Sequence, residues 1–159
     1  MGRNPIILLI PLVLAPLPAR GIDLSLFGSW AETVDAADLE SGAGSDLNGT
    51  YESQVEEVEL TIFNTGGDSD NWRLDVRRTD TEWPPSLTLW IKRTSDGTGN
   101  GTISAGITYQ EVTATDASLC IGSGDRDGIN IQLRLTGMSV TCPPENYLST
   151  VVYTVVDTP

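Results

Sequence analysis

The residue types that carry most enzyme and metal chemistry are scarce in this chain of 159 residues. It contains no histidine, and its two cysteines are Cys120 and Cys142. Histidine is the commonest general base at neutral pH and the commonest metal ligand. Its absence excludes Ser-His-Asp catalysis, Cys-His catalysis and His-containing zinc sites. The carboxylates occur in no recognisable catalytic motif. We therefore expect a protein that is not an enzyme and that uses no cofactor.

Three short acidic segments have some of the residues of a calcium loop. They are Asp68–Asn71, Asp96–Gly101 and Asp125–Gly128. Calcium takes about six to eight oxygen ligands, and none of these segments has the full spacing of acids that a calcium loop needs. Gly, Asn and Asp also favour tight turns. We interpret all three segments as turns and predict no metal site.

Aromatic side chains suggest a different kind of site. Trp90 lies between Leu89 and Ile91, so it faces outward if these two residues face the core. Together with Trp83 and Tyr109 it is a candidate platform for stacking sugar rings. The alternative is that Trp90 packs under a loop or against a neighbouring subunit, since single exposed aromatic residues are common.

The charge is strongly one-sided. There are 22 acidic and 9 basic residues, with a formal net charge of -13, and Lys92 is the single lysine. Nucleic-acid binding needs a basic face, so this balance argues against it. Arg73 and Arg77 share a predicted strand with Asp75. They either pair with carboxylates across the sheet or form a basic patch that meets the acidic 32–59 region of another copy.

The N-terminus has the three parts of a secretory signal peptide. Arg3 is the positive residue, Ile6–Leu14 is the apolar core, and Ala19-Arg20-Gly21 fits a cleavage site. We predict a signal peptide over residues 1–21 and a single domain over 22–159, with no membrane span in the mature chain. The alternative is an uncleaved N-terminal anchor. In a secreted chain Cys120 and Cys142 most simply form one disulfide.

The elements that must position these residues are strands. Four segments alternate aliphatic or aromatic with polar residues, which is typical of half-buried strands: 58–62, 72–76, 87–91 and 129–135. Residues 22–30, 103–112 and 147–156 are further candidates, and 32–50 reads as a long polar loop. No segment has a convincing helical stripe. The pattern predicts an all-β fold, an antiparallel Ig-like β-sandwich of about seven to eight strands.

The C-terminal end carries a family resemblance. Pro143-Pro-Glu-Asn-Tyr147 precedes a final run of Thr and Val to Val156. This segment resembles the last strand of secreted bacterial pilus subunits and spore coat protein U-like domains. In Ig-like sandwiches a tyrosine near this position often bonds back to the upstream backbone. The resemblance covers about the last 15 residues and the signal peptide, and the chain lacks the cysteine that these families commonly carry near the mature start.

The resemblance implies assembly by strand donation. In such pilins an N-terminal alternating segment enters the sheet of the next subunit, and here Ile22, Leu24 and Leu26 are the candidate donor side chains. The alternative is that residues 22–30 form the first strand of the chain's own sandwich.

We therefore expect a secreted structural subunit of a surface fibre or pilus-like assembly, whose partners are other copies or other surface subunits. The alternative function is a secreted carbohydrate- or ligand-binding module that uses Trp83, Trp90 and Tyr109 to hold a glycan.

Overall fold

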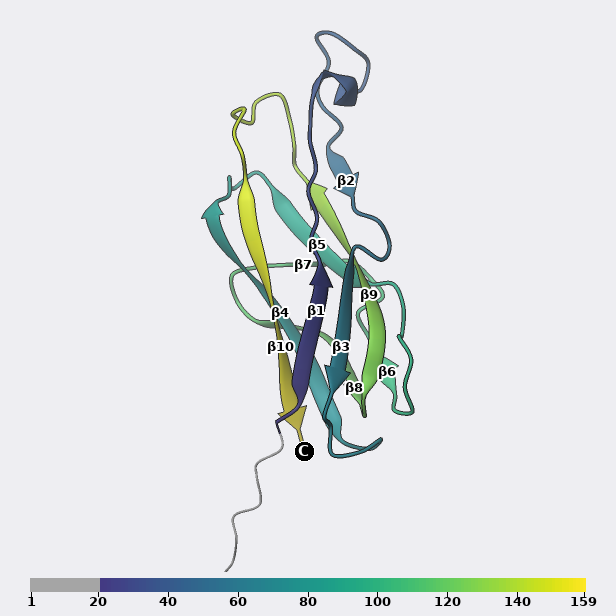
Figure 1. The fold of residues 1–159 in the computed structure, drawn as a ribbon. Coiled ribbons are helices and arrows are strands. Elements are labelled where there is room, and N and C mark those ends of the chain that lie inside the picture. Colours follow the sequence, from purple (N-terminus) through teal and green to yellow (C-terminus); the bar gives the residue numbers. More distant parts are fainter. Residues whose placement is uncertain (1–20) are drawn as a thin grey trace, which may run out of the picture.

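Two antiparallel sheets face each other in the computed structural model, which describes residues 21–159 (Figure 1). The predicted signal peptide therefore lies almost entirely outside the described residues. The larger sheet contains β1 (Asp23–Gly28), β2 (Thr50–Glu52), β3 (Val58–Phe63), β5 (Thr88–Arg93), β7 (Gln110–Glu111) and β9 (Arg126–Thr136). The smaller sheet contains β4 (Asn71–Glu82), β6 (Ile103–Ser104), β8 (Ala117–Ser123) and β10 (Leu148–Thr158).

The all-β, two-sheet prediction is confirmed, but the number of strands is higher than expected. The larger sheet has the order β1-β3-β9-β5-β7, with β2 also paired to β9, and the smaller one has the order β10-β4-β8-β6. The described residues form ten strands, because β2, β6 and β7 each add a pairing of two or three residues. The single strand predicted over 103–112 is wrong: Ala105 and Gly106 have φ values of +65° and +76° and turn the chain, so only the short β6 and β7 form within this range. Within residues 21–159, no helix is long and apolar enough to cross a membrane.

The core lies between the sheets, and the four alternating segments build it as predicted. The inward side chains of β3, β4, β5 and β9 are all buried: Val58, Leu60, Ile62, Trp72, Leu74, Val76, Leu89, Ile91, Ile129, Ile131 and Leu133. Their polar neighbours point to the outer faces. Each strand therefore buries one face, as the two-residue period of a β-strand requires.

A second, smaller core lies at the end of the sandwich where β9 is joined to β10. Tyr51, Leu87 and Leu135 are its buried members, and Tyr147 packs against them. The Tyr147 hydroxyl donates a hydrogen bond to the Pro143 carbonyl at 2.5 Å. The sequence prediction that this tyrosine bonds back to the upstream backbone is confirmed.

The predicted disulfide is wrong, because Cys120 and Cys142 are both free. Cys120 lies on β8 opposite Leu74 and is fully buried in the main core. Cys142 belongs to the connection between β9 and β10 and packs against the smaller core. A disulfide needs Cα atoms within about 7 Å and Cβ atoms that point toward each other. Cys120 packs in the main core and Cys142 against the smaller one, so the two thiols have different neighbours. Burial raises the pKa of the Cys120 thiol to about 12.

Candidate functional site

The three candidate donor residues lie along one open edge of the sandwich. Within the described residues, strand β1 pairs with β3 and has no strand on its other side. Leu24 is opposite Ile62 and Leu26 is opposite Leu60, so these leucines face the interior. Ile22 and Leu24 pack against the main core, whereas Leu26 remains 46% exposed. In this structure the segment is therefore the first strand of its own sandwich.

The closing segment continues beyond β1. Trp30 packs against both cores and Val34 packs against the smaller one. Residues 22–34 thus cover one long edge of the sandwich, and we call them the seam segment. Sequence reasoning placed its end at residue 30 and missed Val34. Part of the signal was present in the sequence, because Ile22, Leu24, Leu26, Trp30 and Val34 all lie at even positions, although Gly28 and Glu32 interrupt the series.

Gly28 allows the seam segment to lie close to β3. It has a φ of +112°, and a Cβ atom at this position would lie 2.1 Å from the Glu57 carbonyl oxygen. A larger residue would both strain the backbone and push the segment outward. The neighbouring Phe27 is 81% exposed on the outer face, opposite Glu59. At the end of β1, the backbone of Gly28 therefore lies close to Glu57, whereas the side chain of Phe27 is exposed.

The last strand lies at the same edge of the molecule as β1. In Figure 1, β10 (yellow) runs beside β1 (purple), and the two strands are in contact although they belong to different sheets. Among residues 21–159, β10 pairs with β4 alone. Its inward Val151, Tyr153 and Val155 pack against the main core. The Tyr153 hydroxyl is buried without a hydrogen-bond partner in the described structure, and burial raises the pKa of Tyr153.

The predicted aromatic platform is only partly assembled. Trp90 lies on β5 and Tyr109 directly precedes β7, which pairs with β5, whereas Trp83 packs against both cores and donates its indole N–H to the Leu87 carbonyl. The Trp90 indole N–H donates to the Thr136 hydroxyl at 2.9 Å. All three aromatic residues are only partly exposed. The sequence placed all three rings on one surface, whereas the structure packs Trp83 against the two cores.

Two cations lie against the ring of Tyr109. The Lys92 amine is 4.4 Å and the Arg134 guanidinium 3.6 Å from the ring centroid. Arg134 also forms an ion pair with Glu52 at 2.7 Å. These cation–π contacts occupy the ring on which a sugar would stack. Sequence reasoning missed this arrangement, because Tyr109, Lys92 and Arg134 come from three different strands or loops.

The acidic segments are turns with internal partners. Thr65 donates to Asp125 through both its amide and its hydroxyl, which lowers the pKa of Asp125. Thr61 donates to Asp127 at 2.7 Å, and Asp96 forms an ion pair with the buried Arg93. In the described part of the chain, no group of three or more His, Cys, Asp or Glu residues could hold a metal ion.

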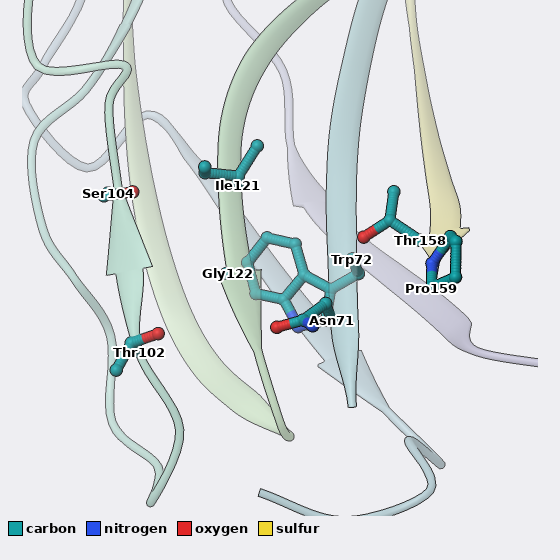
Figure 2. Close-up of a pocket in the computed structure, with 8 residues that line it drawn as sticks. All are labelled: Asn71, Trp72, Thr102, Ser104, Ile121, Gly122, Thr158 and Pro159. Atoms are coloured by element: carbon teal, nitrogen blue, oxygen red, sulfur yellow. The ribbon is translucent and has the colours of Figure 1, made fainter. Parts of the chain in front are cut away.

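A shallow pocket opens at the end of the smaller sheet (Figure 2). Its volume is about 240 Å³, and it contains no charged side chain. The sticks in Figure 2 show Ile121, Asn71 and several hydroxyl groups around the edge of Trp72. Trp72 can sit here because residue 122 is glycine: a Cβ at Gly122 would lie 2.5 Å from the indole ring. The pocket therefore lies where Trp72 of β4 packs against β8.

No protein-family model, no curated protein and no solved structure matches this chain. The resemblance to pilus subunits remains a hypothesis that rests on the C-terminal residues. The open edge formed by the seam segment and β10 is the feature of the fold that most directly suggests a function.

Proposed function

We propose that this protein is an exported structural subunit that assembles with other copies by donating its seam segment. The observation that carries the proposal is the position of β1. Among residues 21–159 it is an edge strand that pairs with β3 and with no other strand, and Leu26 and Phe27 are 46% and 81% exposed. Residues 29–49 connect it to β2 without a strand of their own, apart from the isolated Leu39–Leu47 bridge. Such a segment can leave one sandwich and enter another without disturbing the other strands.

Exchange of the seam segment should give an assembly that dissociates slowly. A donated segment makes the same contacts in a neighbour that it makes in its own chain, so exchange has a small free-energy difference. Backbone hydrogen bonds to β3 supply affinity, and the inward Ile22, Leu24 and Trp30 set the register. Release requires these side chains to leave the core together. If each copy gives its segment to the next one, the contact is heterologous and a fibre grows.

We propose further that the fold is an Ig-like sandwich and that the protein is located at the cell surface. The Tyr147–Pro143 hydrogen bond supports an Ig-like sandwich of the pilus-subunit type. The one-sided charge of -13 suits a surface protein that must stay soluble before assembly. The glycan-binding alternative has less support, because Tyr109 is engaged by Lys92 and Arg134 and Trp83 packs elsewhere.

A disulfide across the seam tests the proposal. Ser25 and Thr61 are directly opposite each other on β1 and β3, and paired residues of antiparallel strands have Cα atoms roughly 4.5 to 5.5 Å apart. We would build Ser25→Cys/Thr61→Cys in a Cys142→Ser background. Oxidation of the monomer should lock β1 into its own chain and prevent assembly, and reduction should restore it. Oxidation after assembly should instead join different chains into a ladder.

The matched control is a disulfide that does not hold the seam segment. Thr79 and Thr150 are opposite each other on β4 and β10, so Thr79→Cys/Thr150→Cys locks two strands of the smaller sheet. This variant should assemble as the unmodified chain does. Assembly is followed on denaturing gels, with and without boiling, of material taken from the cell surface. Equal assembly of the seam-locked and control proteins would overturn the proposal, as would an unmodified chain that stays monomeric.

A further inference from the structure

Strand β10 has the longest unpaired edge in the described structure. The other edge strands are β1 with six residues, β2 with three, and β6 and β7 with two each, whereas β10 has one side unpaired over the nine residues from Thr150 to Thr158. From Thr150 to Thr158 its main chain makes backbone hydrogen bonds to β4 and to no other described residue. None of its residues is fully buried, including those that face the core. A row of backbone donors and acceptors therefore lies open beside the sheet.

Natural proteins usually protect such an edge, and β10 lacks these protections. Lysine, proline and inward charges are the common devices that prevent edge-to-edge pairing. The sequence of β10 is LSTVVYTVVDT, which contains none of them except a single acid, Asp157, near its end. The pairing with β4 shifts register only between Leu148 and Ser149, so the rest of the strand is regular. From Thr150 to Val156 the edge is uncharged and rich in residues with high β-propensity.

We propose that β10 pairs with β10 of a second copy, antiparallel and about a two-fold axis. This contact deepens the proposed function by naming a second interface between copies, and it joins two four-stranded sheets into one continuous sheet. The occupant is argued from the strand itself. Another β10 matches its length and offers the same uncharged backbone edge. An antiparallel arrangement also brings the Asp157 residues to opposite ends, so no like charges face each other.

The two interfaces can coexist because they use different sheets. The seam segment pairs with β3 of the larger sheet, whereas β10 extends the smaller one. Strand donation would connect copies along a fibre, and β10 pairing would connect them side by side. A contact through one strand edge buries less area than the ~1,200 Å² of a standard interface, so we expect a weak dimer. Because each copy is strongly acidic, its affinity should rise with salt as mutual repulsion is screened.

The first test uses the oxidised seam-locked protein, in which strand donation is blocked. Sedimentation equilibrium should show a reversible monomer–dimer equilibrium that strengthens between low and high salt. Hydrogen exchange measured at low and high protein concentration should show β10 amides that become protected as dimer forms, while β1 and β3 amides do not change. A protein that stays monomeric, or a dimer whose β10 amides exchange as in the monomer, would overturn the proposal.

The second test places charges on the edge. In Val152→Lys/Thr154→Lys the new side chains lie on the outer face of β10 close to the expected two-fold axis, and dimer affinity should fall at least tenfold. The control Ser118→Lys/Ile121→Lys makes the same charge change on exposed residues of β8, two strands from the edge. It should dimerise at least as well as the parent. Equal weakening of both variants contradicts edge pairing. If the edge variant fails to fold, the hydrogen-exchange result on the seam-locked parent decides.

Discussion

Gly122→Ala should be among the most damaging single-methyl changes in this protein. Gly122 lies on β8 opposite Trp72, whose indole is fully buried in the main core. A Cβ atom at residue 122 would lie 2.5 Å from Trp72 Cζ2 and 2.5 Å from the Thr102 carbonyl oxygen. The indole cannot simply swing away, because its N–H donates to the Gly124 carbonyl at 2.9 Å. The Thr102 carbonyl is held in place as well, because it accepts a hydrogen bond from the Ser123 amide at 2.8 Å.

The size of the effect follows from these contacts. Overpacking a core costs roughly 1–3 kcal/mol, and weakening the indole hydrogen bond adds about 1 kcal/mol. We therefore expect the free energy of unfolding to fall by about 2–4 kcal/mol, a large part of the roughly 5–15 kcal/mol that stabilises a typical domain. At about 4 °C per kcal/mol for a domain of this size, the Tm should fall by about 8–16 °C.

Urea unfolding followed by tryptophan fluorescence and circular dichroism measures this change. Gly49→Ala is the matched control, because a Cβ there meets no atom within 4 Å and the backbone is not in the left-handed region. It should alter the free energy of unfolding by no more than about 0.5 kcal/mol. If Gly122→Ala were as stable as Gly49→Ala, the close packing of Trp72 under β8 would be wrong.

Three further predictions concern the thiols, an acidic contact and a buried cation. A thiol reagent should label Cys142 in the native protein and Cys120 only after unfolding, and the absence of any free thiol in denaturant would contradict the two free cysteines. Asp46 accepts hydrogen bonds from the Val140 and Leu47 amides, which lower its pKa. Because its folded pKa is depressed, its contribution to stability is present above the ordinary aspartate pKa and is lost as pH falls through the folded value. The Val140 amide shift should report this loss in acid and should not do so in Asp46→Asn. Arg93→Lys should destabilise the fold by roughly 2–3 kcal/mol. The buried guanidinium donates to the Ala105 and Ser95 carbonyls in a geometry that an amine cannot reproduce. An unchanged midpoint of urea unfolding would refute this prediction.

The central strands could be predicted from the sequence because their burial leaves a local pattern. The alternate apolar residues that begin at 58, 72, 87 and 129 in the predicted segments 58–62, 72–76, 87–91 and 129–135 are all buried. Alternation identifies a strand but not the strand that it pairs with, so the order of the strands within each sheet could not be predicted. The pattern over 103–112 predicted one strand, but the positive φ values of Ala105 and Gly106 interrupt it and leave the two-residue strands β6 and β7.

The disulfide prediction failed for a related reason. The expectation used the number of cysteines and the expected compartment, and neither contains information on which sheet or core a cysteine joins. Cys120 follows the inward pattern of β8, and Cys142 lies in a connection whose position depends on the packing of Tyr147 and Leu135. Contacts such as those of Arg134 and Lys92 with Tyr109 were equally inaccessible, because they form between residues that are distant in the chain.

The seam segment shows most clearly what an alternating sequence pattern cannot predict. A segment that closes its own sandwich and a segment that closes a neighbour's need the same alternation of side chains, since both fill the same groove beside β3. The alternation of Ile22, Leu24 and Leu26 therefore predicts a strand in either case, and the structure shows one of the two occupancies. The difference lies in the free-energy barrier for exchange and in the chain concentration. For this reason the seam disulfide, which fixes the occupancy covalently, is more informative than deletion of the segment, which would expose the core in both cases.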